Sequence, residues 1–170
     1  RAGVQAVRRT VRTAHRMGIR FVTLYCFSTE NWNRPAQEVS FLLDLLAHQI
    51  EAESLILHRD GVRVRFLGRR EDLSDRMRNV MVRVESLTKN NAGLTLSFAI
   101  NYGGRREITD AVRRIVASGV PADAVSEELI ERYLDTAGMP DPDLIVRTAG
   151  EQRLSNFLIW QACYAGYYFT

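Results

Sequence analysis

The order of apolar and polar residues along this chain predicts several short strands. Residues 19–27 form an almost unbroken apolar run with β-branched and aromatic side chains, which is typical of a strand buried on both faces. Residues 94–100 predict a second such strand, and shorter runs at 62–67 and 144–146 predict two more. The longer runs lack the polar alternation of a half-solvated strand, so we expect them inside a covered sheet.

Between the strands, apolar residues recur at helical spacing. This period predicts helices over residues 38–58, 73–88, 105–116 and 126–134, and an opening helix over 1–17. The opening helix carries its apolar residues on one face: Val4, Val7, Val11, Ala14 and Met17. The pattern assigns no type to the apolar segment 156–165.

Strands that alternate with helices indicate an α/β protein with a single layer of mostly parallel sheet flanked by helices. The sequence has 170 residues, of which 46% are hydrophobic and 25% charged, and this balance fits one globular domain over residues 1–170. The opening helix has no capping residue, and an aromatic run breaks off at Thr170. We therefore expect a domain that is truncated at both ends.

Composition and charge exclude several other classes. The two cysteines, Cys26 and Cys163, are too few for a disulfide framework and form no zinc motif, which favours a reducing, cytoplasmic compartment. The net charge of +3 is too small to indicate a nucleic-acid partner. No apolar run approaches the roughly 20 residues that span a bilayer. The three histidines have no metal-ligand spacing and form no recognisable Ser-His-Asp arrangement.

In sheets of this type, ligands bind beyond the carboxyl ends of the strands. The segment 147–155 leaves the last predicted strand and brings two guanidinium groups and two hydroxyl groups into nine residues. Donors of fixed geometry beside a tight turn suit a diphosphate. The alternative is a surface loop whose arginines pair with Glu151 and Asp143.

Two further segments follow predicted strands. The loop 28–35 places Ser28, Asn31, Trp32 and Arg34 together, and these residue types orient anions or stack on an apolar substrate. Alternatively this loop is a polar lead-in to the next helix, with Trp32 in the core. The turn at 101–105, Asn-Tyr-Gly-Gly-Arg, matches neither a Walker A nor a dinucleotide motif, and a tight turn is its simpler interpretation.

In this order, the segments resemble the cis-prenyltransferases, and above all the bacterial undecaprenyl diphosphate synthases. The resemblance spans nearly all 170 residues and rests on three segments of this sequence: Phe-Ser-Thr-Glu-Asn-Trp-Asn-Arg-Pro at 27–35, Asn-Tyr-Gly-Gly-Arg at 101–105, and residues 141–161 with Arg-Leu-Ser-Asn-Phe-Leu inside them. It implies condensation of isopentenyl diphosphate with an allylic diphosphate such as farnesyl diphosphate, to make a cis-polyprenyl diphosphate. It also implies Mg²⁺, a homodimer, a tunnel for the growing chain, and transient membrane contact through the product.

By position, the resemblance assigns roles to individual residues. Arg147, Arg153 and Ser155, with Leu154 between them, match the isopentenyl diphosphate clamp. Asn31 matches the residue assigned to proton removal, although an amide is a poor base and orienting the substrate suits it better. The remaining matches belong to the substrate loop and its neighbours: Ser28, Thr29, Glu30, Trp32 and Arg34. The helix at 38–58 lines the implied tunnel, with Leu42, Leu43 and Leu46 as candidates that core packing explains equally well.

Two features depart from the family pattern. The phosphate-binding segment Asp-Gly-Asn-Gly-Arg-Trp, which supplies a magnesium-binding aspartate, would lie before Arg1. Gly166 stands where the family has a glutamate ligand, and Gln152 stands where some members have a histidine near the metal. Because Mg²⁺ takes one or two protein carboxylates as well as phosphates, we expect these 170 residues to be inactive or impaired.

Two alternatives remain open at this point. A non-catalytic partner subunit of the same fold would explain Gly166, but the intact set of Arg147, Arg153 and Ser155 argues against it. A general phosphoanion-binding module, such as a nucleotide binder, would explain the arginines without catalysis. The lack of a nucleotide motif argues against that alternative.

Overall fold

A three-stranded sheet and three long helices make up the first of the two units into which the chain divides, Arg1–Asn101. The computed structural model describes residues 2–148 and 150–170. The elements that begin in this unit are, in chain order, α1 (Ala2–Arg16), β1 (Phe21–Ser28), the 3₁₀ turn η1 (Thr29–Asn33), α2 (Ala36–Arg59), β2 (Arg63–Leu67), α3 (Asp75–Thr88) and β3 (Thr95–Tyr102).

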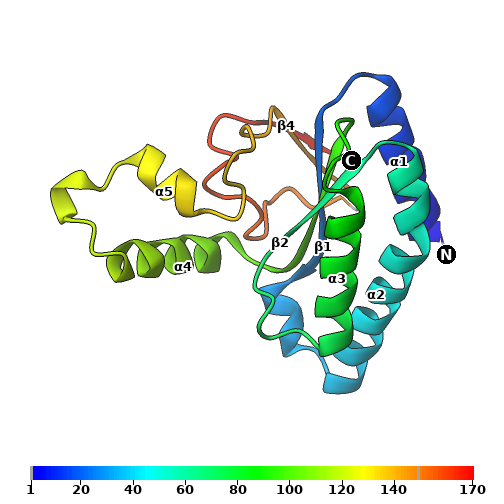
Figure 1. Cartoon of the computed structure of the whole chain (residues 1–170), viewed down its shortest axis with the longest axis horizontal. Coiled ribbons are helices and arrows are strands. Elements are labelled where there is room, and N and C mark those ends of the chain that lie inside the picture. Colours follow the sequence, from blue (N-terminus) through cyan, green and yellow to red (C-terminus); the bar gives the residue numbers. More distant parts are fainter. Residues whose placement is uncertain (1, 149) are drawn as a thin grey trace. The chain divides into compact units, whose positions relative to one another are not determined.

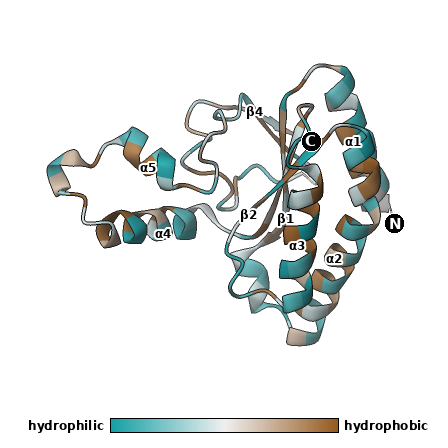
Figure 2. Ribbon diagram, in the orientation of Figure 1, coloured by the Kyte–Doolittle hydropathy of each residue, from teal (hydrophilic) through white to brown (hydrophobic). Residues whose placement is uncertain are grey.

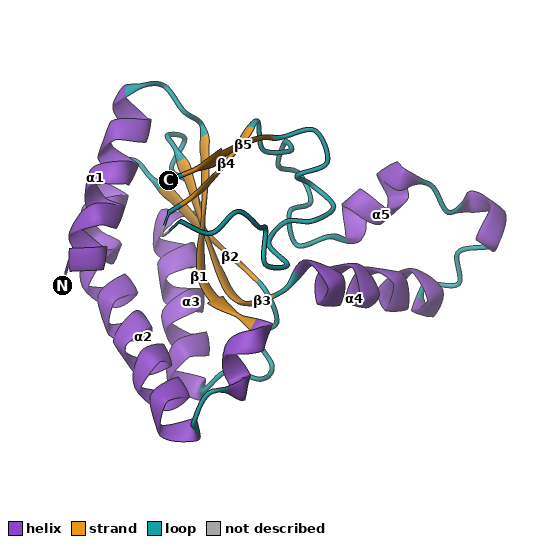
Figure 3. Ribbon diagram, turned by 180° about the vertical axis from the view of Figure 1, so that it is seen from behind, coloured by secondary structure: helices purple, strands orange, loops and turns teal. Residues whose placement is uncertain are grey.

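The strand order is β1-β3-β2, and β2 runs parallel to β3 with Val64 opposite Leu96 and Phe66 opposite Phe98. Every residue of β3 after Thr95 is buried, including the polar Ser97 and Asn101, as expected for a central strand. α1, α2 and α3 lie together on one face of this sheet (Figures 1 and 3). This arrangement confirms the expected α/β class with a parallel sheet flanked by helices.

Each of these helices is amphipathic, with hydrophobic and hydrophilic segments alternating along its ribbon (Figure 2). In α3 the buried residues Met77, Val80, Met81 and Val84 recur at the predicted spacing. In α1, Val11 and Ala14 are buried as expected, whereas Met17 is 71% exposed. The prediction for Met17 was wrong because the helix ends at Arg16 and the chain turns away at Gly18. Val4 lies outside the residues whose side chains are described.

The second unit, Tyr102–Thr170, contains α4 (Gly104–Ala117), the 3₁₀ turn η2 (Ala122–Ala124), α5 (Glu127–Tyr133), β4 (Leu144–Arg147) and β5 (Gly166–Phe169). β4 and β5 pair in parallel, with Leu144 opposite Gly166 and Arg147 opposite Phe169. The sequence pattern did not predict β5. Its side chains are largely exposed, so it has no buried face to produce an apolar period.

A buried carboxyl group organises the interior of this unit. Glu107 on α4 is 5% exposed and accepts hydrogen bonds from the Tyr102 hydroxyl at 2.5 Å and the Asp135 backbone N–H at 2.9 Å. The Gln161 amide also donates to it, at 3.1 Å. Burial raises the pKa of Glu107, although these donors oppose the shift. The network ties α4 to two segments that have no regular structure of their own.

Among the described residues, no helix combines the length and the apolar character that crossing a bilayer requires.

We predict that Gly68→Ala destabilises the protein far more than Gly61→Ala. Both glycines have positive φ, +107° and +72°, but only at Gly68 would a Cβ meet a backbone atom, at 2.1 Å from the Ile100 carbonyl oxygen. Gly61→Ala should lower the free energy of unfolding by about 1 kcal/mol through its left-handed conformation alone. Gly68→Ala should lower it by about 3 kcal/mol or more, because the β3 backbone cannot move aside. Urea denaturation followed by circular dichroism measures both, and equal losses would contradict the prediction.

Candidate functional site

The loop after β1 begins with a hydrogen bond that orients Asn31. The backbone N–H of Ser28 donates to the Asn31 Oδ1 atom at 2.9 Å, across the first turn of η1. Because an N–H donor requires the amide oxygen, this contact identifies which side of the amide carries the NH₂ group. The Asn31 NH₂ group is therefore the part of the side chain that can donate toward a ligand.

A buried asparagine holds the tryptophan of the same loop. Trp32 Nε1 donates to Asn101 Oδ1 at 2.7 Å, and its ring meets Phe27 edge-on at 5.5 Å. Asn101 is 1% exposed and donates its own NH₂ group to the Arg69 carbonyl at 2.9 Å and to Asp72 at 3.2 Å. Trp32 is 38% exposed, so it does not lie in the core, where the alternative interpretation of this loop places it.

The remaining residues of the predicted substrate loop lie at the start of η1 and just after it. Thr29 and Glu30 open the 3₁₀ turn. Arg34 donates to Glu38, four residues further along the chain, at 2.6 Å, and this ion pair is exposed. Desolvation, with a smaller contribution from the Glu30 charge, raises the pKa of Tyr25 to about 12.

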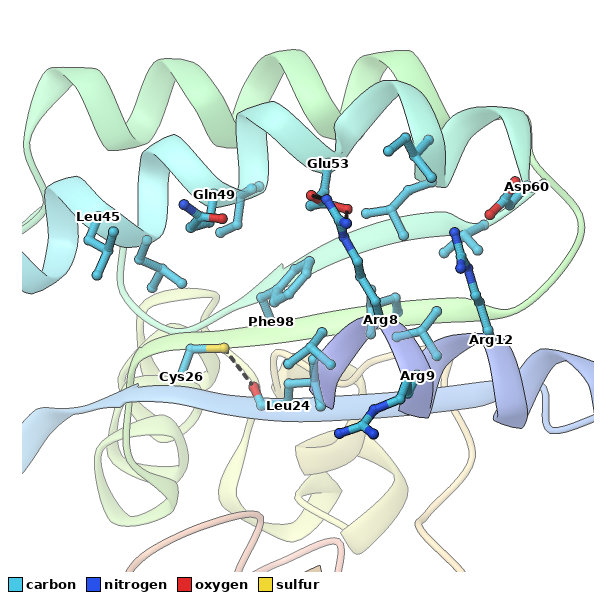
Figure 4. A pocket seen from close by; sticks show the side chains of 18 of the residues that line it. Arg8, Arg9, Arg12, Leu24, Cys26, Leu45, Gln49, Glu53, Asp60 and Phe98 are labelled. Carbon is cyan, nitrogen blue, oxygen red and sulfur yellow. Dashed lines mark hydrogen bonds and ion pairs between the residues drawn. The ribbon is translucent and has the colours of Figure 1, made fainter. Parts of the chain in front are cut away.

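Asn31 and Arg34 are among the residues that line a groove of about 1320 Å³ in the first unit. Its lining is mostly apolar and comes from α1, α2, β1 and β3, as Figure 4 shows from close by. A pocket for a drug-sized ligand measures roughly 300–1,000 Å³, so this groove suits a longer ligand. Of the three leucines predicted for a tunnel, Leu42 and Leu46 line it, whereas Leu43 is buried in the core.

Cys26 also lies in this groove (Figure 4). Its thiol is open to the groove and faces the Leu24 carbonyl oxygen at 3.6 Å. The surrounding protein desolvates the thiol and raises its pKa to about 12. Cys26 therefore behaves as a neutral part of an apolar wall.

In the second unit, the structure brings together the three polar residues predicted for a clamp. The Arg147 guanidinium donates from Nη1 to the Ser155 hydroxyl at 2.6 Å, and it also contacts the Arg153 carbonyl and the Glu151 carboxylate. Arg153 donates to the same carboxylate at 2.6 Å. The two guanidinium groups thus converge on one anionic group at the carboxyl end of β4. Residue 149 lies outside the described residues.

The pairing with Glu151 agrees in part with each of the two interpretations of segment 147–155, the diphosphate site and the surface loop with paired arginines. The arginines form ion pairs with Glu151, as the alternative predicts, but both do so through a single shared carboxylate. A shared anion between two converging guanidinium groups is the geometry that a phosphate also takes. Arg153 is two-thirds exposed, so an external anion can reach it.

Unusual backbone conformations follow the clamp directly. Ser155 and Asn156 both have positive φ, 51° and 65°, and such residues gather at ligand-binding turns. The loop is held against the start of α4 because Gly104 donates to the Asn156 carbonyl at 2.7 Å and Arg105 to its side chain at 2.9 Å. A Cβ at Gly104 would meet Ile159 at 2.6 Å, which explains the glycine.

The other predicted positions contribute less to this arrangement. Leu154 is half-buried and Gln152 is exposed. Gly166 begins β5, and a Cβ there would find only ordinary contacts, at 3.6 Å or more. Packing in this unit therefore does not require glycine at position 166.

Potential metal ligands do not gather into a cluster in the part of the chain that the structure describes. No group of three or more His, Cys, Asp or Glu side chains comes together among residues 2–148 and 150–170. Gly166 offers no carboxylate where the resemblance places a glutamate ligand, and Gln152 stands where some members have a histidine near the metal.

Sequence reasoning assigned no individual role to Asn101, and it named Glu151 only in the alternative, as a partner of the arginines. Asn101 precedes a Gly-Gly pair at the end of a strand, where asparagine often takes positive φ, and it does so here at 52°. Glu151 stands between Arg147 and Arg153 in the sequence, and this position indicates that it can pair with either arginine.

Comparison with known proteins gives consistent matches over the whole chain. A family model described as "Putative undecaprenyl diphosphate synthase" matches residues 1–170. An isoprenyl transferase from Agrobacterium fabrum is 51% identical over 174 residues, which cover 100% of this chain and 70% of that protein. A ditrans,polycis-undecaprenyl-diphosphate synthase specific for (2E,6E)-farnesyl diphosphate, from Aliivibrio fischeri, is 42% identical over 174 residues. The match covers 100% of this chain and 68% of that protein.

The crystal structure of lavandulyl diphosphate synthase from Lavandula x intermedia, in complex with dimethylallyl diphosphate, matches with a TM-score of 0.94. It is 31% identical, and the match covers 99% of this chain and 75% of that one.

We predict that Cys26 alkylates slowly although the groove exposes it. With a pKa of about 12, its thiolate fraction at pH 8 is small, so iodoacetamide should react at least about a hundredfold more slowly than with free cysteine. The rate should rise about tenfold per pH unit from pH 7 to pH 9, because the thiolate is the nucleophile.

A Cys163→Ser variant isolates Cys26 for this measurement, and mass spectrometry follows the reaction. The same variant unfolded in urea should react at the ordinary rate. Labelling of the folded variant as fast as free cysteine would contradict the desolvated thiol.

Proposed function

Because this chain belongs to the undecaprenyl diphosphate synthase family, we propose that it is a cis-prenyltransferase that condenses isopentenyl diphosphate with an allylic diphosphate. In this reaction the allylic carbon loses diphosphate and bonds to the terminal alkene carbon of isopentenyl diphosphate, which then loses a proton. Farnesyl diphosphate is the proposed allylic substrate, by analogy with the specificity named for the Aliivibrio relative.

The convergence of Arg147 and Arg153 on one carboxylate, beside the Ser155 hydroxyl, is the observation that carries this proposal. In the proposed complex the diphosphate of isopentenyl diphosphate replaces Glu151 between the two guanidinium groups. Charge-assisted hydrogen bonds to phosphate oxygens then offset the loss of the internal ion pairs. Asn156, which follows Ser155 directly, is already held in place by its hydrogen bonds with the first residues of α4.

The loop after β1 is proposed to orient the reacting groups. Asn31 presents its NH₂ group, because Ser28 occupies its oxygen, so it positions substrate and does not act as a base. Arg34 and Trp32 supply a cation and an aromatic face on the same loop. Ser28, Thr29 and Glu30 form the turn that carries them.

The groove of the first unit is proposed to hold the growing prenyl chain. A polyprenyl tail has no hydrogen-bonding groups, and it gains about 0.8 kcal/mol for each CH₂ that leaves water. Leu42 and Leu46 offer such a surface. A long product of this kind also partitions into lipid, which supports the proposed transient contact with a membrane.

We include a homodimer in the proposal because the second unit exposes several large apolar side chains, among them Leu144, Val146 and Tyr168 at 56–58% exposure. Mg²⁺ is the cofactor implied for the family, but the described residues do not fit a magnesium site. We therefore assign it no step, and we propose that this chain by itself is inactive or impaired in elongation.

A second candidate function is that of a non-catalytic partner subunit. The glycine at position 166 favours it, since the space around that position would accept a side chain without strain. Such a subunit would stabilise or recruit a catalytic family member, and it would still bind diphosphates through the clamp.

We expect Arg147→Ala to weaken binding of isopentenyl diphosphate by about tenfold or more. The variant loses a guanidinium that contacts both the Ser155 hydroxyl and the shared anion, and hydrogen bonds to charged groups contribute about 1.5–3 kcal/mol. Arg113→Ala is the matched control, because Arg113 is an exposed arginine of the same unit that pairs only locally with Asp110. Isothermal titration measures both variants, and unchanged affinity for Arg147→Ala would remove this residue from the clamp.

Incubation of the chain with farnesyl diphosphate, labelled isopentenyl diphosphate and Mg²⁺ tests elongation directly. Little or no long-chain product is expected from the chain alone, because stabilising a diphosphate leaving group needs a positioned metal and donors. Product that forms only after adding a catalytic family member, above that member's own yield, would favour the subunit function. Abundant product from the chain alone would overturn the proposed impairment.

A further inference from the structure

An ion pair crosses the apolar groove of the first unit. Arg8 on α1 donates from Nε to the Glu53 Oε2 atom on α2 at 2.7 Å, and its Nη2 atom contacts the second carboxylate oxygen. Both residues line the groove, and Figure 4 shows Arg8 extending from one helix to the other. The Glu53 side chain is only 15% exposed, so this bidentate pair lies partly inside the groove wall.

The pair divides the groove along the axis of α2. Leu45 and Gln49 lie on one side of it, whereas Arg12 and Asp60 lie on the other (Figure 4). Glu53 follows Leu42 by eleven residues in an unbroken helix, which places it about 16 Å further along the axis at about 1.5 Å per residue. The part of the groove between Leu42 and the ion pair is therefore a compartment of limited length.

An apolar chain cannot pass this point without a penalty. A hydrocarbon forms no hydrogen bond with either partner, so a tail that separates them leaves a carboxylate and a guanidinium without their counter-charges. A tail that stops before them loses nothing. Beyond the pair, the charged residues Arg12 and Asp60 replace part of the apolar lining.

We propose that the Arg8–Glu53 ion pair limits the length of apolar chain that the groove accepts, and so acts as a specificity determinant for product length. This inference rests on the proposed function, in which the groove holds a prenyl tail. A purely structural role, in which the pair only ties α1 to α2, makes a different prediction. Losing the pair would then change the stability of the protein but not its preference among chain lengths.

The decisive variant is the double substitution Arg8→Met with Glu53→Met. It removes both charges together, because a single substitution would leave the other charge unpaired in the groove. The matched control is Arg83→Met with Glu51→Met, which removes an ion pair between α3 and α2 that does not line the groove. A charge reversal, Arg8→Glu with Glu53→Arg, restores a pair at the original place.

Binding of n-alkyl phosphates from octyl to octadecyl, measured by isothermal titration on this chain, tests the proposal without catalysis. In the unchanged chain, affinity should rise by up to about fourfold per added CH₂ and then level off at a fixed chain length. In Arg8→Met/Glu53→Met the rise should continue to longer chains. The control and the charge reversal should level off where the unchanged chain does.

The same levelling point in the unchanged chain and in Arg8→Met/Glu53→Met would overturn the proposal, even if the melting temperature falls. The same is true if the unchanged chain shows no levelling over this series. If the chain elongates farnesyl diphosphate, the double variant should also give longer products than the control. If the chain binds no isopentenyl diphosphate but its levelling point still shifts in Arg8→Met/Glu53→Met, the proposed function fails while the limit set by the ion pair holds.

Discussion

The Asn101 amide is the interaction on which the loop geometry of the first unit depends. It sits at the end of the central strand with almost no exposure, and both of its functional groups are occupied. Its oxygen accepts from Trp32 at 2.7 Å, and its nitrogen donates to Arg69 and Asp72. A buried amide of this kind is stabilising only while all partners remain, so the loops after β1 and β2 are positioned together or not at all.

A second constraint acts on α2, which has to serve a core and a groove with one sequence. Leu43 and Ala47 are buried in the core, Leu42 and Leu46 line the groove, and Ile50 is buried and lines the groove as well. Apolar surface left uncovered in this way is unfavourable unless a ligand covers it. The apolar face of α2 therefore has to cover the core and also line one side of the groove of about 1320 Å³.

The candidate site of the second unit is built from charged side chains, whereas that of the first unit is a largely apolar groove. Glu151 keeps two guanidinium groups close together that would otherwise repel each other, and Ser155 holds one of them from the side. The positive φ values at Ser155 and Asn156 are maintained by hydrogen bonds from the first residues of α4. An anion site prepared in this way loses little conformational entropy when a phosphate replaces the carboxylate.

The sequence by itself determined the elements whose period is set by burial. The long helices, the strands β1 to β4 and the α/β class follow from apolar spacing, because local burial and local conformation agree in those segments. The residue types at 28–34 and 147–155 were also sufficient to select both candidate loops. The sequence could not predict β5, whose side chains are largely exposed, or the exposure of Met17 just beyond a helix end.

Only the tertiary structure decided which of several equivalent side chains does what. Leu42 and Leu43 are neighbours on α2, and only the tertiary structure places Leu43 in the core and Leu42 on the groove. Glu151 could have paired with either arginine, and folding brought both to it. Arg8 and Glu53 are 45 residues apart in sequence, so no local pattern relates them. Contacts between distant segments depend on how the helices pack on the sheet, and that packing is a property of the whole fold.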